Sequence, residues 1–274
     1  VLTGDGGDEM FGGYSGYSVE SMMNRIRQVP PWIRNGLVRN LLKVFPNTPS
    51  AGFNEQKARL VRNLDRVDLP AADRFFSRHQ VFTAEDKAKL FSADFLQHLN
   101  NDLDISQRLQ GYITVPAKDN NIDKMLYLDT QLYLPNDMLM KVDRMSMAVS
   151  LEARVPLLDY RLVEMAAKIP PSMKLRGFRG MKHIFKQSMR DSLPENIITQ
   201  KKQGFGTPIS RWFRSSLQPL LKDVLSRERI EQRGYFNADA ISKLMDDHMQ
   251  QRADHSEHIL ALLTFEIWHQ VYLD

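Results

Sequence analysis

The sequence predicts a mainly α-helical chain that begins with the end of one strand of a parallel α/β sheet. Residues Val1–Gly4 read as a strand end and run directly into a loop rich in glycine and acidic residues. Beyond that loop, apolar residues recur at mixed spacings of three and four, the pattern of helices that pack along one face. Ligands bind beyond the carboxyl ends of strands in open parallel sheets, so residues 3–14 would occupy a ligand-binding position.

The composition is that of a folded globular chain, long enough for one large domain or two ordinary ones. The 274 residues include 37 Lys and Arg, 33 Asp and Glu, 42% hydrophobic residues and no cysteine. The lack of cysteine excludes a disulfide framework, a thiolate metal site and a cysteine nucleophile within this chain. Neither a run of about 20 apolar residues nor a signal-peptide pattern is present, so we expect a soluble, cytoplasmic protein without membrane contacts. Because the chain begins with Val1 and not with Met, we expect it to be part of a longer protein.

The helical pattern continues along most of the chain, and prolines separate its segments. Thr83 followed by Asp86 predicts a capping box at the start of one helix. Residues 121–134 place Met125, Leu128 and Leu132 on one helical face. The helices expected ahead of that segment span residues 17–28, 32–45, 55–64, 70–80 and 84–99.

The end of the chain repeats an apolar residue every four positions, at Ile259, Leu263, Ile267 and Val271. This spacing predicts a final helix that packs on the body of the protein through those residues. We find no internal repeat and no low-complexity segment.

The net charge of +4 is distributed unevenly. Residues 171–214 contain ten Lys and Arg but only two Asp and Glu, a charge of +8, so the rest of the chain carries −4. The opposite pole is the opening loop, where Asp5, Asp8 and Glu9 lie within five residues. A concentrated basic segment suits either the phosphates of a nucleotide or a nucleic-acid surface. The segment has few clustered aromatics for base stacking, so a helical nucleic-acid-binding module is the more distant alternative.

The opening loop suits a divalent cation. Three carboxylates on a glycine-rich loop fit Mg²⁺, which takes one or two protein carboxylates and completes its octahedron with water and phosphate oxygens. Glycines at positions 4, 6 and 7 would let the backbone approach a ligand closely. The acidic ladder of an EF-hand and the Gly-Lys-Ser/Thr of a phosphate-binding loop are both absent. The alternative is an ordinary acidic turn, because Gly and Asp dominate turns for conformational reasons.

A second segment, residues 136–148, alternates charged and apolar residues at helical spacing. Asp137 and Lys141 lie four residues apart and would share a face, with Arg144 nearby. The alternative to a functional role is a helix with a Met-rich buried stripe and structural ion pairs. The sequence leaves the roles of Lys141, Asp143 and Arg144 open.

A third segment places a lysine at the start of a helix. Gly177 and Gly180 precede a helix expected to begin near Met181, so Lys182 in its first turn would project toward a pocket. A lysine opposes the dipole at a helix N-terminus, and a phosphate bound at the same helix end would explain its presence there. The alternative is a solvated basic face. His183 is assigned no role.

Four ordered motifs resemble those of the glutamine-hydrolysing asparagine synthetases. The opening loop, residues 3–14, reads TGDGGDEMFGGY, and Thr3 and Asp5 stand where that family commonly has Ser and Glu. The second motif is KVDRMSMA from position 141 with EARVPLLD from 152, the third is MKH from 181, and the fourth is KQGFGTP from 202 with Trp212. The order of the motifs makes chance a poor explanation, although residues 25–120 match only loosely.

The resemblance implies an ATP-dependent amide-forming ligase of the ATP-pyrophosphatase type. In that family an acceptor carboxylate, aspartate in the namesake, attacks the α-phosphorus of Mg-ATP to form an acyl-adenylate and pyrophosphate, and ammonia from glutamine then displaces AMP. Carried over by position, Asp8 would be the Mg²⁺ ligand and Asp5 would face the acyl-adenylate. Lys182 would stabilise charge on the α-phosphate and on the tetrahedral intermediate. Gly4 and Gly6 would join Asp8 and Lys182 in binding the nucleotide.

The resemblance also implies a fold, in which residues 1–274 are the C-terminal part of a parallel-sheet synthetase domain of the adenine-nucleotide-α-hydrolase type. The family's N-terminal cysteine and its pyrophosphate-gripping Ser-Gly-Gly-x-Asp-Ser loop are absent from the sequence. We therefore expect the chain alone to form no amide and to release no AMP, and acceptor-dependent AMP release from it would contradict this. The alternative is a relative that adenylates another carboxylate, such as a β-lactam-forming synthetase or an amidotransferase acting on a sugar acid. A homodimer stays open.

Overall fold

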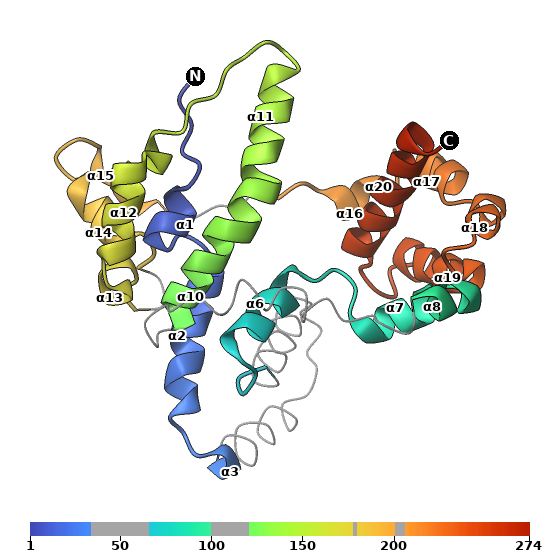
Figure 1. The fold of residues 1–274 in the computed structure, drawn as a ribbon, viewed down its shortest axis with the longest axis horizontal. Coiled ribbons are helices and arrows are strands. Elements are labelled where there is room, and N and C mark those ends of the chain that lie inside the picture. The colour runs from blue at the N-terminus through green and yellow to red at the C-terminus, as the bar shows by residue number, and fades with distance from the viewer. Residues whose placement is uncertain (34–65, 100–120, 178–179, 201–205) are drawn as a thin grey trace. The chain divides into compact units, whose positions relative to one another are not determined.

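The computed structural model describes residues 1–33, 66–99, 121–177, 180–200 and 206–274, and the chain divides into two compact units (Figure 1). Unit 1 comprises Val1–Phe76 and Leu109–Lys202, and unit 2 comprises Ser77–Arg108 and Gln203–Asp274. The regular structure of the described residues is helical. No helix among them is long and apolar enough to cross a membrane.

Unit 1 contains the opening loop and the helices around it. Most of α6 belongs to this unit, together with one π-helix, η3, and one short 3₁₀-helix, η4. The bounds are α1 Gly7–Phe11, α2 Ser15–Arg27, α3 Pro31–Ile33, α6 Ala71–His79, α10 Asn121–Leu128, η3 Asp129–Leu139, α11 Met140–Met147, η4 Pro156–Leu158, α12 Tyr160–Lys168, α13 Pro171–Lys174, α14 His183–Ser188 and α15 Glu195–Thr199.

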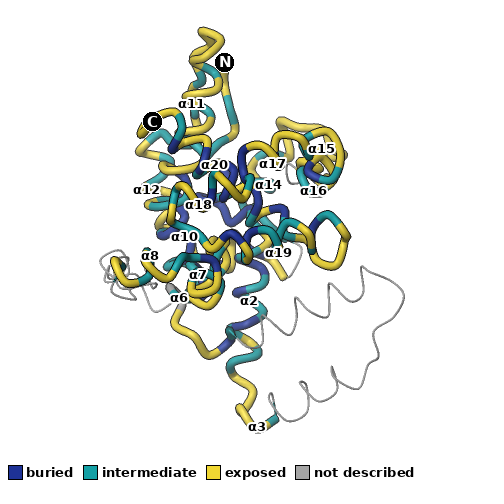
Figure 2. Tube along the Cα trace, turned by 90° about the vertical axis from the view of Figure 1, so that its right-hand side faces the viewer, coloured by how far each residue is buried: buried dark blue, intermediate teal, exposed yellow. Residues whose placement is uncertain are grey.

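Two apolar clusters hold unit 1 together. In the first, Tyr17 of α2 packs with Phe75 of α6 and Met125 of α10, and all three side chains are nearly fully buried. Figure 2 colours the chain by burial and shows buried stretches in α2 and α10. In the second, α1 packs against α12 and α14, and the ring of Phe11 stacks on that of Phe185 with centroids 4.8 Å apart. Burial of the apolar side chains of α1 fixes the short helix that carries Asp8 and Glu9.

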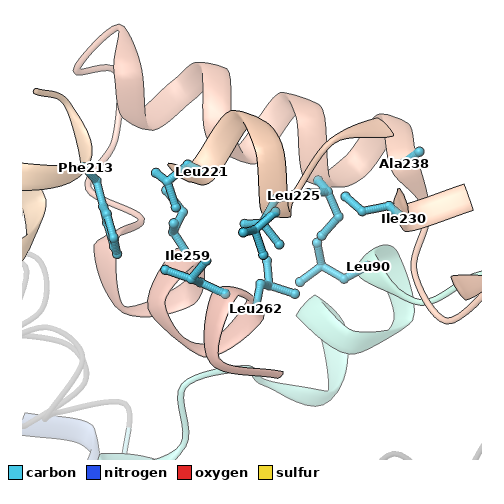
Figure 3. Packing of buried hydrophobic residues seen from close by; sticks show 11 residues of the cluster. Leu90, Phe213, Leu221, Leu225, Ile230, Ala238, Ile259 and Leu262 are labelled. Carbon is cyan, nitrogen blue, oxygen red and sulfur yellow. The ribbon is translucent and has the colours of Figure 1, made fainter. Parts of the chain in front are cut away.

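Unit 2 has its own apolar core, formed where short helices pack around the last helix of the chain. Figure 3 shows Leu221, Leu225, Ile259 and Leu262 meeting in this core, with Leu90 contributed by a helix from much earlier in the sequence. The bounds are α7 Ala84–Leu90, α8 Ala93–His98, α16 Ile209–Phe213, α17 Gln218–Val224, α18 Arg227–Arg233, α19 Ala238–Met249 and α20 Ser256–Tyr272.

The predicted strand end forms an isolated parallel bridge, and the part of the chain that is described contains no longer strand. Leu2 pairs with Arg154 in this bridge. The Thr3 N–H donates to the Arg154 carbonyl at 2.9 Å, and the Arg154 N–H donates to the Val1 carbonyl at 2.8 Å. The amino terminus of Val1 donates to the Glu152 carbonyl at 2.6 Å. The two extended segments therefore run parallel, as two neighbouring strands of the expected sheet would.

Several helix predictions are confirmed. The segments 17–28 and 70–80 form α2 and α6. Thr83 and Asp86 form the predicted capping box: Thr83 Oγ1 accepts from the Asp86 N–H at 3.1 Å, and the Thr83 N–H donates to Asp86 Oδ2 at 2.9 Å. The predicted helix 55–64, and the part of 32–45 that follows Ile33, lie outside the described residues.

The single helix predicted over 84–99 is wrong, because α7 and α8 replace it. The helical path breaks at Phe91, which pairs with Phe236 across an antiparallel bridge. Ser92 then begins α8 as its N-cap, and its Oγ accepts from the Phe95 N–H at 3.2 Å. The Ser92 N–H donates to the Tyr235 carbonyl at 2.9 Å. Apolar spacing continues across this break, so periodicity could not reveal it.

The helix predicted over 121–134 is confirmed and extends beyond its predicted end. α10 continues into η3 and then α11 without a break in the helical path. Met125 and Leu128 are buried, and Leu132 packs beside them as predicted. Pro135 lies inside η3 and lacks an N–H, while Asn136 Nδ2 donates to the Leu132 carbonyl at 2.8 Å. A side chain therefore supplies a donor close to the position where proline removes one.

The Met-rich buried stripe considered for residues 136–148 is wrong. Met140, Met145 and Met147 are 43%, 65% and 54% exposed, and α11 has no buried residue. The ion pair between Asp137 and Lys141 is confirmed at 3.7 Å, and both side chains are exposed. The sequence spacing correctly placed these charges on one face but could not show that the opposite face is also exposed.

The predicted buried face of the final helix is only half right. Ile259 and Leu263 are buried in α20, whereas Ile267 and Val271 are 40% and 65% exposed. Four residues advance about 400° around an α-helix, so a face repeated every four residues drifts by about 40° at each step. The residues of α20 that are buried follow shorter steps, at positions Ser256, Ile259, Leu262, Leu263, Glu266 and His269.

Candidate functional site

The opening loop contains a five-residue helix, α1, with a left-handed glycine at each end. Gly6 precedes the helix with φ of 82°, and Gly12 follows it with φ of 72°. Glycine adopts this conformation without the strain that a Cβ would cause. The Gly13 N–H donates to the Asp8 carbonyl at 2.8 Å and closes the turn after the helix. This short, tightly closed helix determines the directions of the side chains of Asp8 and Glu9.

The three acidic side chains of the loop point to three different partners. Asp5 Oδ2 accepts from the Thr3 hydroxyl at 2.7 Å. Glu9 Oε1 accepts from the Tyr14 hydroxyl at 2.6 Å, and Glu9 is 2% exposed. Asp8 turns the other way, toward Lys182. Asp5 and Glu9 thus have partners of their own, and no group of three or more His, Asp or Glu in the described residues is arranged to hold a metal. Asp8 as the Mg²⁺ ligand stays a prediction.

Lys182 meets Asp8 although the two residues are far apart in the sequence. Its Nζ lies 2.9 Å from Asp8 Oδ1, and the two side chains are 23% and 19% exposed. The predicted helix begins at His183 rather than near Met181, so Lys182 is its N-cap and not part of its first turn. Lys182 has φ of 54°, a left-handed conformation that is uncommon for a residue with a Cβ. A sparsely populated backbone conformation at such a contact is typical of functional sites.

Gly13 lies beneath the contact between Asp8 and Lys182. A Cβ built on Gly13 would lie 1.7 Å from Asp8 Oδ1 and 2.3 Å from Lys182 Cε. A Cβ built on Gly4, which the family resemblance assigned to the nucleotide, would have no such neighbour within 4 Å. The sequence drew attention to glycines 4 and 6, whereas the structure adds Gly13 as the residue whose missing side chain makes room for the pair.

A layer of tyrosines and buried carboxylates supports the loop from the inside. Tyr17 donates its hydroxyl to Asp129 Oδ2 at 2.5 Å, and the ring of Tyr14 lies 5.8 Å from that of Tyr17. Burial raises the pKa of the Glu9 carboxyl, against the opposing effect of its hydrogen bond from Tyr14. Burial, and then the bonds to the carboxylates, raise the pKa of both Tyr14 and Tyr17. Sequence reasoning counted Glu9 among the acidic residues of the loop and missed this layer, although the closely spaced tyrosines were visible.

The π-helix η3, which overlaps the start of the second predicted segment, contacts the loop through a residue that precedes that segment. The ring of Tyr133 stands edge-on to that of Tyr14, with centroids 5.9 Å apart. Burial raises the pKa of Tyr133, and a hydrogen bond with Asp137 adds to the shift. Asp143 and Arg144 lie farther along, on the exposed helix α11. The π-helix η3 therefore contacts the loop through Tyr133, and rare π-turns are often found at functional sites.

The described basic residues of segment 171–214 have different surroundings and belong to both units. Lys174 is 3% exposed, Lys182 is paired with Asp8, and Lys186 Nζ donates to the Gln200 carbonyl at 3.4 Å. The boundary between the two units falls after Lys202, so Arg211 and Arg214 belong to unit 2. Lys201 and Lys202 lie outside the described residues. Among the described residues of the segment, Lys182 contacts the acidic loop through Asp8.

Replacing Lys174 with methionine should raise the free energy of unfolding at pH 7 by about 1 kcal/mol, because a buried charge is exchanged for an apolar chain of similar length. Burial lowers the pKa of Lys174, and the nearby Asp123 opposes this only in part. The folded state therefore binds the proton less tightly than the unfolded state. The penalty for burying the charge is present at low pH and disappears as the pH rises through the folded pKa toward 10.5.

Urea denaturation of the wild type and Lys174→Met between pH 7 and pH 10 would test this prediction. The advantage of the variant should shrink as the pH rises. Lys168→Met, at an exposed position of α12, is the matched control and should show no such trend. A variant that is less stable than wild type by the same amount at every pH would contradict the interpretation.

The geometry permits a cation at Asp8 only in combination with other ligands. Asp8 offers carboxylate oxygens, which Mg²⁺ prefers, and Gly13 leaves room beside them. Asp5 and Glu9 are directed to Thr3 and Tyr14 instead. A one-carboxylate site is within the range for Mg²⁺ when phosphate oxygens and water supply the remaining ligands. The arrangement therefore fits a metal that is bound together with a phosphate.

Comparison with known proteins gives a match over nearly the whole chain. The family model described as asparagine synthase matches residues 1–270. Asparagine synthetase [glutamine-hydrolyzing] 1 of Bacillus subtilis is 30% identical over 274 residues, covering 100% of this chain and 40% of the relative. A putative asparagine synthetase [glutamine-hydrolyzing] of Mycobacterium bovis is 25% identical over 278 residues, covering 100% of this chain and 39% of the relative.

Proteins with another name also match. Amidase chry2 of Gibberella zeae is 21% identical over 259 residues, covering 90% of this chain and 37% of the relative. No solved structure matches the chain significantly. The chain therefore spans about two fifths of the length of these relatives, which bear more than one functional name.

Proposed function

The chain belongs to the asparagine synthase family, and we propose that it carries nucleotide- and acceptor-handling residues of an ATP-dependent amide-forming ligase. In the proposed reaction an acceptor carboxylate attacks the α-phosphorus of ATP, which releases pyrophosphate and leaves an acyl-adenylate. Ammonia then attacks the acyl carbon, AMP leaves, and the amide forms. The observation that carries the proposal is the contact of 2.9 Å between Lys182 Nζ and Asp8 Oδ1 at the glycine-rich loop.

Lys182 is proposed to stabilise the charge that develops on the α-phosphate and on the tetrahedral intermediate. Reactions of this kind depend mainly on positioning and charge neutralisation, because the phosphate oxygens carry most of the developing charge. The left-handed backbone of Lys182 directs its long side chain to the loop, where those oxygens would lie. Asp5 is proposed to face the acyl-adenylate, and its bond from the Thr3 hydroxyl would hold it in place.

Asp8 is proposed as the Mg²⁺ ligand, and Gly4 and Gly6 as backbone positions next to the nucleotide. When bound, Mg²⁺ would neutralise phosphate charge. The protein's own residues would hold the Asp8 carboxylate in a fixed direction. The hydrogen bonds that close α1 and the buried Glu9 serve this purpose.

The acceptor is proposed to be aspartate, with ammonia derived from glutamine, because the Bacillus relative is named a glutamine-hydrolysing asparagine synthetase. A different carboxylate acceptor is the second candidate, and it is favoured by the match to a protein named an amidase. Screening carboxylic acids for acceptor-dependent AMP release would separate the two candidates.

We also propose that the extended segments at residues 1–3 and 152–155 are neighbouring strands of a parallel sheet. Their hydrogen bonds use the peptide groups of Val1, Thr3 and Arg154. The peptide group of Leu2 therefore faces the opposite side, where a further strand could pair. In a chain extended upstream of Val1, slow hydrogen exchange at the Leu2 amide is expected, and fast exchange would contradict the sheet.

Replacing Lys182 with alanine in a protein that also carries a glutaminase domain should lower amide synthesis by roughly 10²–10³-fold, the cost of losing one preorganised charge partner. Glutamine hydrolysis should be unchanged, since Lys182 contacts the opening loop of this chain, which is proposed to serve amide synthesis and not glutamine hydrolysis. Amide formation and glutamate release would be measured in parallel. Lys186→Ala removes the same charge from a half-buried position of α14, where its Nζ donates to the Gln200 carbonyl, and should leave amide synthesis near wild type. Near-normal synthesis by Lys182→Ala would show that the role given to Lys182 is wrong.

A further inference from the structure

The contact between Lys182 and Asp8 occupies the carboxylate that is proposed to bind metal. Lys182 Nζ lies 2.9 Å from Asp8 Oδ1, and both side chains are largely sheltered from solvent. Gly13 lies beneath both groups, and a Cβ at this position would meet each of them. We propose that Lys182 is a stand-in cation for Asp8, which means that its ammonium group occupies the carboxylate in place of a metal. A divalent ion then binds the Asp8 carboxylate only when a phosphate draws Lys182 away. The inference rests on the proposed role of Asp8 as a metal ligand.

A lysine and a divalent ion cannot share this oxygen. Mg²⁺ binds carboxylate oxygen at about 2.0–2.1 Å, which would place it next to an ammonium group that is itself within hydrogen-bonding distance of that oxygen. Two cations so close in a partly desolvated site repel each other strongly. A bare metal ion must therefore displace Lys182 before it can bind to Oδ1 of Asp8.

The neighbouring carboxylates offer a metal ion little compensation for that displacement. Glu9 is buried, with Oε1 bonded to the Tyr14 hydroxyl, and Asp5 is bonded to the Thr3 hydroxyl. A bare divalent ion would gain one carboxylate and lose favourable hydration. A metal that arrives with a phosphate brings its own additional oxygen ligands, and the phosphate also offers Lys182 a new anion.

The backbone of Lys182 is held while its side chain remains able to move. The residue is the N-cap of α14, and its carbonyl accepts from the Lys186 N–H at 2.8 Å. A lysine side chain has a flexible four-carbon stem. Exchange of Lys182 between Asp8 and a phosphate therefore needs rotation of one side chain and no rearrangement of the helix.

Mn²⁺ binding to the 274-residue chain tests the proposal without any enzymatic assay. Five of the 14 glycines lie in the opening loop, so a protein labelled with ¹⁵N-glycine reports on the loop directly. Mn²⁺ bound at Asp8 would broaden the amide signals of glycines 4, 6, 7, 12 and 13, and the same sample before Mn²⁺ is added serves as the reference. The variants are Lys182→Ala, its longer counterpart Lys182→Met, and the matched control Lys186→Ala.

Both Lys182 variants should show loop broadening at a roughly tenfold lower Mn²⁺ concentration than the wild type, since the competing cation is gone. Lys186→Ala should behave like the wild type. Adding Asp8→Asn to Lys182→Ala should return the loop broadening to the higher Mn²⁺ concentration of the wild type. Equal broadening in Lys182→Ala and Lys186→Ala would reduce the effect to net charge and overturn the proposal. Broadening that is no stronger in either folded Lys182 variant than in the wild type would also overturn it.

The same samples separate this inference from the proposed function. If Lys182→Ala binds Mn²⁺ in an Asp8-dependent way while Mn-ATP fails to perturb the loop of the wild type, the exclusion of a bare ion by Lys182 holds, whereas its release by a nucleotide phosphate and the nucleotide assignment both fail. If Mn-ATP perturbs the wild-type loop and Lys182→Ala gains no Mn²⁺, the nucleotide assignment holds and the stand-in role fails.

Discussion

Replacing Gly13 with alanine is expected to abolish amide formation, by at least about 10²-fold, in a protein that carries the complete enzyme, while most of the folding stability is retained. The new Cβ would lie 1.7 Å from Asp8 Oδ1 and 2.3 Å from Lys182 Cε, so both groups must leave their present positions. Both atoms are at the ends of side chains that can rotate away, so the expected destabilisation is only about 1–2 kcal/mol. Activity and urea denaturation of the same preparation would measure the two effects.

Gly4→Ala is the matched control for the steric effect. It lies in the same loop, and its Cβ would meet no atom within 4 Å. Its stability and the Mn²⁺ response of the loop should therefore remain those of the wild type. If Gly13→Ala kept full activity, the packing of Asp8 and Lys182 over Gly13 could not be a requirement of the reaction.

Replacing Arg74 with alanine should destabilise unit 1 by about 3–5 kcal/mol, because it leaves the buried Glu20 carboxylate without its partner. Arg74 and Glu20 are 4% and 3% exposed. The guanidinium binds the carboxylate through two nitrogens, with Arg74 Nε donating to Glu20 Oε2 at 3.0 Å and Arg74 Nη2 donating to Glu20 Oε1. Arg74 Nη1 also donates to the Leu69 carbonyl. Urea denaturation followed by circular dichroism would measure the loss.

Two further variants separate loss of the pair from loss of any charge. Arg161→Ala breaks an exposed ion pair with Asp159 in the same unit and should change stability little, since solvent screens such pairs. The double variant Glu20→Leu with Arg74→Met should recover much of the stability lost by Arg74→Ala, because no buried charge is left unpaired. A small loss in Arg74→Ala would mean that water replaces the missing guanidinium.

The sequence could predict the chemical members of the site but not their arrangement. Asp8 and Lys182 belong to motifs whose residue types suggest a chemical role, so both could be proposed as site residues without coordinates. The direction of Glu9 could not be predicted, because it depends on how the five residues of α1 are rotated by the burial of Met10 and Phe11. The need for glycine at position 13 likewise arises only when two segments distant in the sequence meet.

Fold prediction succeeded where a local interaction determines the structure and failed where contacts distant in the sequence decide it. The capping box of Thr83 with Asp86 needs only neighbouring residues, and it formed as predicted. The break at Phe91 depends on pairing with Phe236, which no local pattern encodes. The π-helix η3 and the exposed α11 show the same limit, because helical periodicity does not reveal which surfaces a helix will have to pack against.

The tyrosine layer beneath α1 gives the protein an intrinsic optical marker. Tyr14, Tyr17 and Tyr133 are three of the eight tyrosines, and burial raises the pKa of each. In an alkaline titration of the folded protein these phenols stay protonated, so part of the tyrosinate absorbance is delayed until the layer opens. A substitution that loosens the loop would make that absorbance appear at lower pH, and the state of the loop can thus be followed without a label, a ligand or a substrate.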